Sequence, residues 1–351
     1  MYLIGAMIIL TESIIRLNAM NDAPTTAVAL AASKARLASY LHPAEWALIA
    51  EDIAAIHDLK RDRRALVLAH NYQTPDIFHG VADVVGDSLA LARAAERFSV
   101  DVLVVAGVHF MAETAKLLNP DRRVLTPDQE AGCSLAASIG PDDVVALKAR
   151  YPGLPVVAYV NTSAAVKALA DYCCTSANAA RVVEAAARDF GSEAVIMLPD
   201  RFLAANTARE TRIKIIPWAG ACEVHERFGP AELTELRERF PGITLLAHPE
   251  CPEPVVAAAD FAGSTAAMAA FLDKHHPSRV ALITECGMSD NLAAAHPETE
   301  FIRTCNLCPH MKRITLGKIR RALETLSPEV KLDPALITAA SRPLQRMLAI
   351  G

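Results

Sequence analysis

Three of the eight cysteines lie at nearly equal intervals along the 351-residue chain. Cys133, Cys222 and Cys308 are separated by 89 and 86 residues. Each cysteine alone is most simply a buried structural thiol. One cysteine from each of three equivalent segments is also a plausible ligand set for an iron–sulfur cluster, and three thiolates leave one iron of a 4Fe–4S cluster without a protein ligand. Such an iron can act as a Lewis acid on substrate oxygens.

Polar residues also recur in pairs, each pair following a short apolar run. Side chains two residues apart on a strand point to the same side, and ligands of parallel α/β sheets bind at the carboxyl ends of the strands. Local hydrogen bonding at strand ends explains any single pair, whereas three equivalent pairs favour a shared binding site. The pairs are His70 and Tyr72, Tyr159 and Asn161, and His248 and Glu250.

Hydroxyl residues open the Ala-rich segments that follow these pairs. Ser88, Ser176, Ser264 and Thr265 stand where helix N-caps are expected. Ordinary capping is the simpler interpretation of each one. Helix N-termini also attract anions through their free N–H groups and the helix dipole. Three of them beside three polar strand ends indicate a cradle for a small, multiply anionic substrate.

The repeated features divide the chain into three similar segments. Ala69, Ala158 and Ala247 are 89 residues apart, and further alanine–aspartate pairs recur at almost the same interval. In each segment an apolar strand, a helix and a second strand follow one another, which predicts parallel sheets with helices on their faces. We expect an α/β fold of three homologous α/β sandwich units in a pseudo-threefold arrangement around a central site. The expected units span residues 61–149, 150–239 and 240–326, with an N-terminal helical extension at 1–60 and a C-terminal tail at 327–351.

Composition restricts the class of protein. Apolar residues make up 52% and charged residues 21%, which excludes a disordered chain. The net charge of −5 argues against a non-specific nucleic-acid binder. No apolar run approaches the ~20 residues that span a bilayer, and residues 2–10 lack the flanks of a signal peptide. We therefore expect a cytoplasmic protein with reduced thiols; Met20 is an alternative start that would make residues 1–19 an extension.

The other cysteines carry less information. Cys173, Cys174, Cys251 and Cys286 are most simply core thiols. Cys305 and Cys308 form a C-x-x-C pair followed by His310, which fits half of a zinc site or a redox dithiol. The sequence offers no second half for a zinc site.

Together these segments resemble the quinolinate synthases, the iron–sulfur enzymes of NAD biosynthesis. The matches occur in order through nearly all of residues 65–320, and some are five or six residues long with rare polar types. One departure is Ile302, where some members carry a further cysteine. The matching segments are LAHNYQ (68–73), GDSL (86–89), GCSLA (132–136), YVNTSA (159–164), CTSAN (174–178), GACEVH (220–225), HPEC (248–251), GSTAAM (263–268) and CPHMKRITL (308–316).

The resemblance implies a three-domain fold around a 4Fe–4S cluster held by Cys133, Cys222 and Cys308. It implies condensation of iminoaspartate with dihydroxyacetone phosphate to quinolinate, with loss of phosphate and two waters. An aspartate oxidase or dehydrogenase is the expected source of iminoaspartate. The implied substrate contacts are His70, Tyr72, Ser88, Tyr159, Asn161, Ser176, His225, His248, Glu250, Ser264 and Thr265.

These residues suggest a division of roles. We expect Ser264 and Thr265 to hold the phosphate or a carboxylate, with Ser88, Asn161 and Ser176 holding the remaining groups. Glu250 and Tyr72 are the candidates for general base and acid, and His70, His225 and His248 for proton relays or hydrogen-bond donors. Two alternatives stay open: another non-redox 4Fe–4S hydro-lyase, and a metal or redox sensor that uses Cys305 and Cys308.

Overall fold

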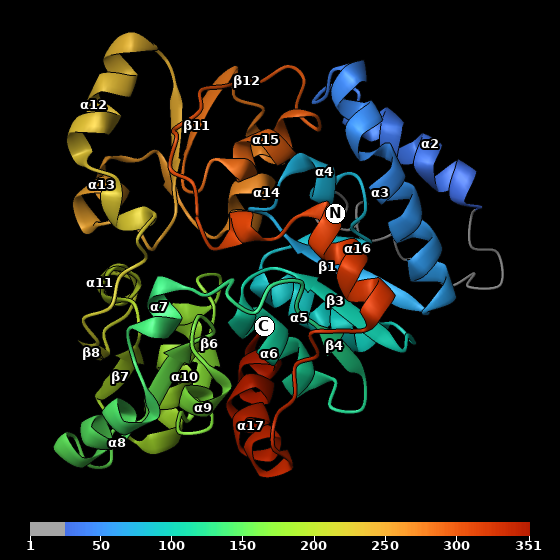
Figure 1. Ribbon diagram of the computed structural model, residues 1–351. Coiled ribbons are helices and arrows are strands. Elements are labelled where there is room, and N and C mark those ends of the chain that lie inside the picture. Colours follow the sequence, from blue (N-terminus) through green and yellow to red (C-terminus); the bar gives the residue numbers. More distant parts are fainter. Residues whose placement is uncertain (1–24) are drawn as a thin grey trace.

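The computed structural model describes residues 25–351 of the chain (Figure 1). The expectations for residues 1–19 and for a start at Met20 lie outside the described residues. The N-terminal segment forms two helices, α2 (Thr26–Leu37) and α3 (Pro43–Asp62). In the described part of the chain, no helix is long and apolar enough to cross a membrane.

Three four-stranded sheets form the framework, and all of their strand pairs are parallel. The predicted α/β fold is confirmed, although the sequence revealed only two of the four strands of each sheet. The strands that it missed are only two to four residues long. The first sheet comprises β1 (Ala65–His70), β2 (Val84–Gly86), β3 (Val102–Ala106) and β4 (Arg123–Leu125); the second β5 (Val156–Tyr159), β6 (Tyr172–Cys174), β7 (Ala194–Leu198) and β8 (Lys214–Pro217); the third β9 (Thr244–Ala247), β10 (Phe261–Ala262), β11 (Arg279–Ile283) and β12 (Glu300–Phe301).

Each sheet has the same strand order, in which the first strand lies between the second and the third. The orders are β2-β1-β3-β4, β6-β5-β7-β8 and β10-β9-β11-β12. In Figure 1 the three sheets surround a common centre. The helices that connect and cover them are α4 (Pro75–Phe78), α5 (Ser88–Arg97), α6 (His109–Leu118), α7 (Ser134–Ala137), α8 (Pro141–Arg150), α9 (Ala164–Lys167), α10 (Ala179–Phe190), α11 (Arg201–Ala208), η2 (His225–Arg227), α12 (Pro230–Arg239), α13 (Glu253–Ala258), α14 (Thr265–His275), α15 (Gly287–Ala293), η3 (Met311–Arg313), α16 (Leu316–Thr325) and α17 (Pro334–Ile350).

Helices cover both faces of the first sheet, which explains why its central strand is apolar throughout. Leu66 and Leu68 face one hydrophobic core, whereas Val67 and Ala69 face another. Successive side chains of a strand point to opposite faces, so a strand buried on both sides needs an unbroken apolar run. The run at 65–69 therefore predicted the strand without any alternation of polar and apolar residues.

The repeated aspartates have the same structural role in all three sheets. The Asp83 carboxylate accepts a hydrogen bond from the backbone N–H of Val67 at 2.8 Å. Asp171 accepts from Val156 at 2.8 Å, and Asp260 accepts from Leu245 at 2.7 Å. Each aspartate thus ties the end of its helix–strand connection to the first strand of the sheet.

The same aspartates form ion pairs with a preceding helix, and this reveals a further repeat. The partners of Asp83, Asp171 and Asp260 are Lys60 of α3, Lys148 of α8 and Arg237 of α12. Each cation lies 23 residues before its aspartate. The helices α3, α8 and α12 are therefore equivalent, and each packs on the sheet that follows it. The unit boundaries at residues 61, 150 and 240 stay a prediction.

The last two helices connect parts of the molecule that are distant in sequence. Ile319 and Leu323 of α16 pack in the core of the first sheet together with Ile56 of α3. The segment expected as a tail contains the 17-residue helix α17. Its buried residues, which include Leu344 and Met347, join the core that spans the first and second sheets.

We predict that Asp171→Ala destabilises the fold, because it leaves the buried N–H of Val156 without an acceptor. The expected loss is about 1–3 kcal/mol in the free energy of unfolding, measured with urea. Asp142→Ala is the control, since Asp142 is exposed on α8, the helix that supplies Lys148. Equal stability of the two variants would contradict a structural role for the repeated aspartates.

Candidate active site

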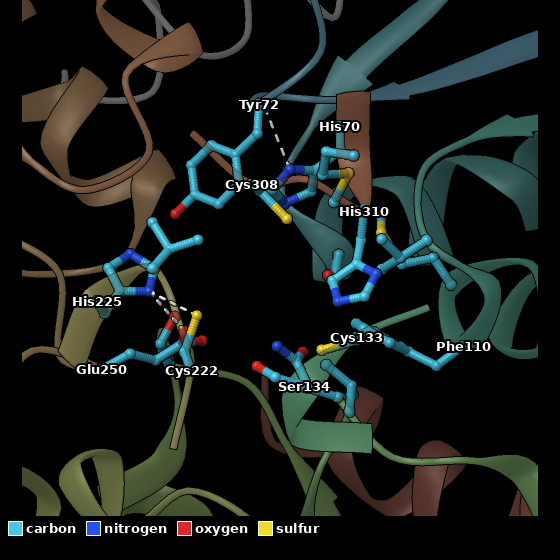
Figure 2. Close-up of a pocket in the computed structure, with 18 of the residues that line it drawn as sticks. His70, Tyr72, Phe110, Cys133, Ser134, Cys222, His225, Glu250, Cys308 and His310 are labelled. Carbon is cyan, nitrogen blue, oxygen red and sulfur yellow. Dashed lines mark hydrogen bonds and ion pairs between the residues drawn. The ribbon is translucent and has the colours of Figure 1, made fainter. Parts of the chain in front are cut away.

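A cavity lies where the carboxyl ends of the three sheets meet; it contains about 750 Å³ of empty space when the part that is open to solvent is included. Its walls come from all three thirds of the chain, as Figure 2 shows for ten labelled residues. Every residue that the sequence singled out for the site lines this cavity, with the exception of Ser264. The residues brought together are His70, Tyr72, Ser88, Cys133, Tyr159, Asn161, Ser176, Cys222, His225, His248, Glu250, Thr265 and Cys308.

The helix caps differ from those expected. Ser264 is the N-cap of α14, and its hydroxyl accepts from the N–H of Ala267 at 3.3 Å. Asp87, not Ser88, caps α5, and α10 begins after Asn178. The expectation that Ser88, Ser176 and Thr265 are N-caps is therefore wrong, and only that for Ser264 is confirmed.

This shift by one or two residues changes what the hydroxyls can do. The hydroxyls of Ser88 and Ser176 line the cavity instead of capping a helix. Thr265 lines the cavity as well, and its hydroxyl accepts from Asn71 Nδ2 at 2.9 Å. Ser264 holds the N-terminus of the helix that carries Thr265.

His70 and His248 occupy equivalent positions and make the same local hydrogen bond. The N–H of Tyr72 donates to His70 Nδ1 at 3.2 Å, and the N–H of Glu250 donates to His248 Nδ1 at 3.3 Å. A neutral ring whose Nδ1 accepts carries its proton on Nε2. Burial lowers the pKa of His70 to about 4 and that of His248 to about 3. Both rings are therefore neutral Nε2–H donors at the cavity wall.

The Glu250 carboxylate is buried and is bound by residues from other parts of the chain. Tyr159 donates its hydroxyl to Oε1 at 2.5 Å, and His225 Nδ1 lies 2.9 Å from Oε2. Burial alone would raise the pKa of Glu250, but the neighbouring His225 and His248 and the hydrogen bonds from His225 and Tyr159 lower it overall. Glu250 is therefore an ionised carboxylate inside the protein.

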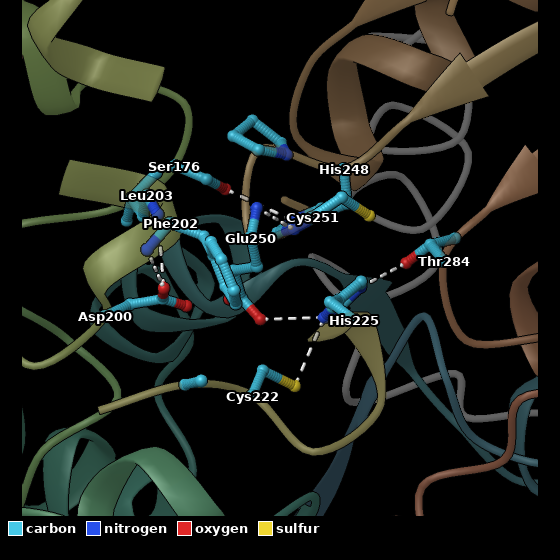
Figure 3. Close-up of polar contacts among 12 residues, drawn as sticks. Ser176, Asp200, Phe202, Leu203, Cys222, His225, His248, Glu250, Cys251 and Thr284 are labelled. Atoms are coloured by element: carbon cyan, nitrogen blue, oxygen red, sulfur yellow. Dashed lines mark hydrogen bonds and ion pairs between the residues drawn. The ribbon is translucent and has the colours of Figure 1, made fainter. Parts of the chain in front are cut away.

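Thr284, which the sequence analysis missed, contacts the second ring nitrogen of His225. His225 Nε2 lies 2.8 Å from the Thr284 hydroxyl, which in turn lies 2.7 Å from the Tyr72 hydroxyl. Figure 3 shows His225 between Glu250 and Thr284. Thr284 directly follows β11, so the reasoning from strand ends that selected His70 applies to it too. A continuous chain of polar contacts thus joins Tyr159, Glu250, His225, Thr284 and Tyr72.

Further residues line the cavity without having been selected from the sequence. His310 Nε2 forms an ion pair with Glu223 Oε1 at 2.9 Å, and Ser134 accepts from the N–H of Glu223 at 3.1 Å. These contacts join the segments that carry the three cysteines. The sequence could have indicated these residues, because each lies within two positions of one of the three cysteines: Ser134, Glu223 and His310.

Cys133, Cys222 and Cys308 all line the cavity, and none of them is in a disulfide. Figure 2 shows them on separate segments around the same space. Burial raises the pKa of Cys133 to about 12, and it also raises the pKa values of Cys222 and Cys308. Three half-buried thiols that line one cavity form a soft donor set, which suits an iron–sulfur cluster once the metal has deprotonated the thiols.

A second donor set overlaps the first. Cys222, His225 and Glu250 have ligand atoms that all lie within 4.8 Å of one another, and they are the only such group of three among the described residues. Two of these contacts are already hydrogen bonds or ion pairs, between His225 and Cys222 at 3.2 Å and between His225 and Glu250 at 2.9 Å. Cys305 is exposed and does not line the cavity.

Comparison with known proteins agrees with this arrangement. Residues 54–349 match the family described as NadA, quinolinate synthetase A protein. The chain is 60% identical over 315 residues to the quinolinate synthase of Agrobacterium fabrum, which covers 90% of each protein. It is 62% identical over 299 residues to that of Xylella fastidiosa, covering 85% of this chain and 87% of the relative. It is 54% identical over 309 residues to that of Caulobacter vibrioides, covering 88% and 84%.

Fold and site together define a class: a three-sheet α/β protein with one cysteine from each third of the chain in a shared polar cavity. Within this class, the chain belongs to the quinolinate synthetase A family. The resemblance found in the sequence is confirmed.

The buried histidines predict a pH-dependent stability. The pKa of His248 falls from 6.5 to about 3 on folding, so the unfolded chain binds more protons than the folded chain between these values. Stability should fall as the pH drops below about 6.5, by roughly 1.4 kcal/mol per pH unit for this histidine. Urea unfolding between pH 7.5 and 5 should give a flatter profile for His248→Gln. Parallel profiles for the wild type and the variant would contradict the neutral assignment.

Proposed function

We propose that this chain catalyses the quinolinate synthase reaction, in which iminoaspartate and dihydroxyacetone phosphate condense with loss of phosphate and two waters. The observation that carries the proposal is the meeting of three cysteines and three polar strand ends in one cavity. Membership of the family supports the same reaction.

We further propose that Cys133, Cys222 and Cys308 hold a 4Fe–4S cluster. When bound, a cluster with three protein ligands would supply an iron that acts as a Lewis acid on substrate oxygens. The shared cavity and the absence of disulfides among the described cysteines support this ligand set.

The substrates carry two carboxylates and a phosphate, yet none of the described residues that line the cavity is a lysine or an arginine. We infer that uncharged donors bind these anionic groups. The Nε2–H groups of His70 and His248 are two of the donors, and hydroxyl and amide groups supply the rest. The remaining donors are Ser88, Asn161, Ser176 and Thr265, while Ser264 acts only by holding the N-terminus of α14.

We propose that Glu250 accepts a proton from substrate carbon and that Tyr72 gives one to a departing oxygen. The contacts between them join the two groups through His225 and Thr284. With both nitrogens of His225 protonated, Nδ1–H keeps its hydrogen bond to Glu250 Oε2 and Nε2–H gives its proton to the Thr284 oxygen, so the proton gained by Glu250 balances the one lost by His225. The Thr284 hydroxyl proton then moves to the Tyr72 oxygen, as Tyr72 gives its own proton to the substrate. Each dehydration thus ends without a net change in the number of protons on the enzyme.

Several expectations about the cellular context remain part of the proposal. Iminoaspartate must be produced by oxidation of an amino acid, and an aspartate oxidase or dehydrogenase would supply it. We expect the enzyme to act in the cytoplasm on small molecules, with no nucleic-acid or membrane partner.

Two other functions lead to different observations. Another 4Fe–4S hydro-lyase would contain the cluster but would form no quinolinate from the two substrates. A sensor based on Cys305 and Cys308 would bind metal without Cys133 or Cys222. The exposure of Cys305 and its position outside the cavity lining favour the enzyme.

Metal analysis of the anaerobically purified protein tests the ligand set. We expect about four irons and four sulfides per chain in the wild type, with loss of both in Cys133→Ala, Cys222→Ala and Cys308→Ala. Cys305→Ala is the matched control and should retain the wild-type content. A single metal ion that survives Cys133→Ala and Cys305→Ala but is lost in Cys222→Ala would instead identify the overlapping set of Cys222, His225 and Glu250 as the site.

Glu250→Gln tests the role of the carboxylate as base. The amide keeps the shape of the side chain but cannot accept a proton, so kcat should fall about 10²- to 10⁴-fold. Binding of quinolinate, measured by equilibrium dialysis, should be retained. Glu253→Gln is the control, because Glu253 is exposed at the start of α13. Near-normal turnover in Glu250→Gln would remove Glu250 from this role.

A further inference from the structure

Lys167, the last residue of α9, is fully buried next to the active-site cavity. Its ammonium group donates to the carbonyl of Val160 at 2.8 Å and to the carbonyl of Thr162. These two carbonyls lie one residue before and one residue after Asn161, which lines the cavity. The Lys167 nitrogen also lies 5.5 Å from the centre of the Phe110 ring, another part of the cavity wall.

A buried ammonium group at this position is less favourable for the stability of the fold than an apolar side chain would be. Transfer of a charged group into a protein interior costs several kcal/mol unless its hydrogen bonds are satisfied. An apolar side chain of similar length would fill the volume without that cost. Burial lowers the pKa of Lys167 to about 8, while the neighbouring Cys173, Glu113 and Cys133 oppose this shift, so the ammonium is still protonated at neutral pH.

The contacts of Lys167 restrain a segment that has no regular secondary structure. Residues 160–163 lie between β5 and α9, where the backbone is not fixed by a continuous ladder of hydrogen bonds. The N–H of Val160 donates to Cys174 at 2.9 Å, and the Thr162 hydroxyl donates to the Tyr159 carbonyl at 3.0 Å. Lys167 adds the two contacts that bracket Asn161. Lys167 therefore restrains the backbone on both sides of Asn161.

We propose that Lys167 is a positioning residue that holds the Asn161 amide in its substrate-binding orientation. The proposal rests on the function proposed above for the cavity. Lys167 acts through Asn161 and does not itself line the cavity. It is therefore expected to affect substrate binding more than the chemical steps.

The test compares Lys167→Met, Asn161→Ala and the double variant in the cluster-containing enzyme. Asn161→Ala first identifies the substrate whose KM depends on the amide. Lys167→Met should raise the KM of that same substrate about ten-fold, with kcat changed by less than about three-fold. In the Asn161→Ala background, Lys167→Met should have no further effect on KM, because residues that act as a unit are not additive.

Lys116→Met is the matched control. Lys116 is also a buried lysine whose ammonium donates to a carbonyl, that of Arg122 at 2.8 Å, and it does not line the cavity. Its loss should lower thermal stability without changing either KM. If Lys167→Met does not fold, Lys167→Gln takes its place, because its side chain is one atom too short to replace both contacts.

The outcomes separate the two proposals. A KM in the Lys167 variant equal to that of Lys116→Met, or KM effects of Lys167 and Asn161 that add, would overturn the positioning role. Absence of quinolinate formation by the wild-type enzyme would overturn the proposed function instead. A selective, non-additive rise in KM supports both.

Discussion

The buried carboxylate of Glu250 is the group on which the arrangement of the site depends. An ionised carboxylate inside a protein is stable only when its oxygens accept hydrogen bonds or face a positive charge. Both oxygens of Glu250 meet this condition through residues from elsewhere in the chain, Tyr159 at the end of β5 and His225 in η2. Thr284 and Tyr72 extend the same network to the third and the first sheet. The sheets must therefore be docked correctly before this charge can be buried.

The contacts that hold each sheet together are the same in all three thirds of the chain, whereas the side chains at the strand ends differ. Within each third of the chain, one aspartate makes the same hydrogen bond to the first strand and the same ion pair to the preceding helix. These contacts fix the frame of each sheet. The strand ends, in contrast, carry different side chains: His70 in one sheet, Tyr159 in the next and His248 in the third. A threefold frame thus presents an asymmetric set of groups, as two unlike substrates require.

The features of the fold and the site that depend on local sequence pattern could be predicted from the sequence. The interval between the repeats, the apolar runs and the polar residues at their ends predicted the three sheets and about half of the residues that line the cavity. The helix caps were misplaced because a cap depends on where a helix begins to within one residue, and Asp87 and Ser88 are both good candidates. The roles of Thr284 and Lys167 depend on contacts across sheets or on backbone carbonyls, which leave no periodic trace in the sequence.

The position of Glu250 also explains why the cavity wall contains uncharged donors instead of lysine or arginine. An ammonium or guanidinium group within about 4 Å of Glu250 would attract the carboxylate strongly in so poorly hydrated a site. It would then compete with His225 for Oε2 and lower the basicity of Glu250 further. Neutral Nε2–H groups and hydroxyls can bind substrate anions without this competition. The nearby buried cation, Lys167, is turned toward the carbonyls of Val160 and Thr162, where its charge is used to hold the wall and not to neutralise the base.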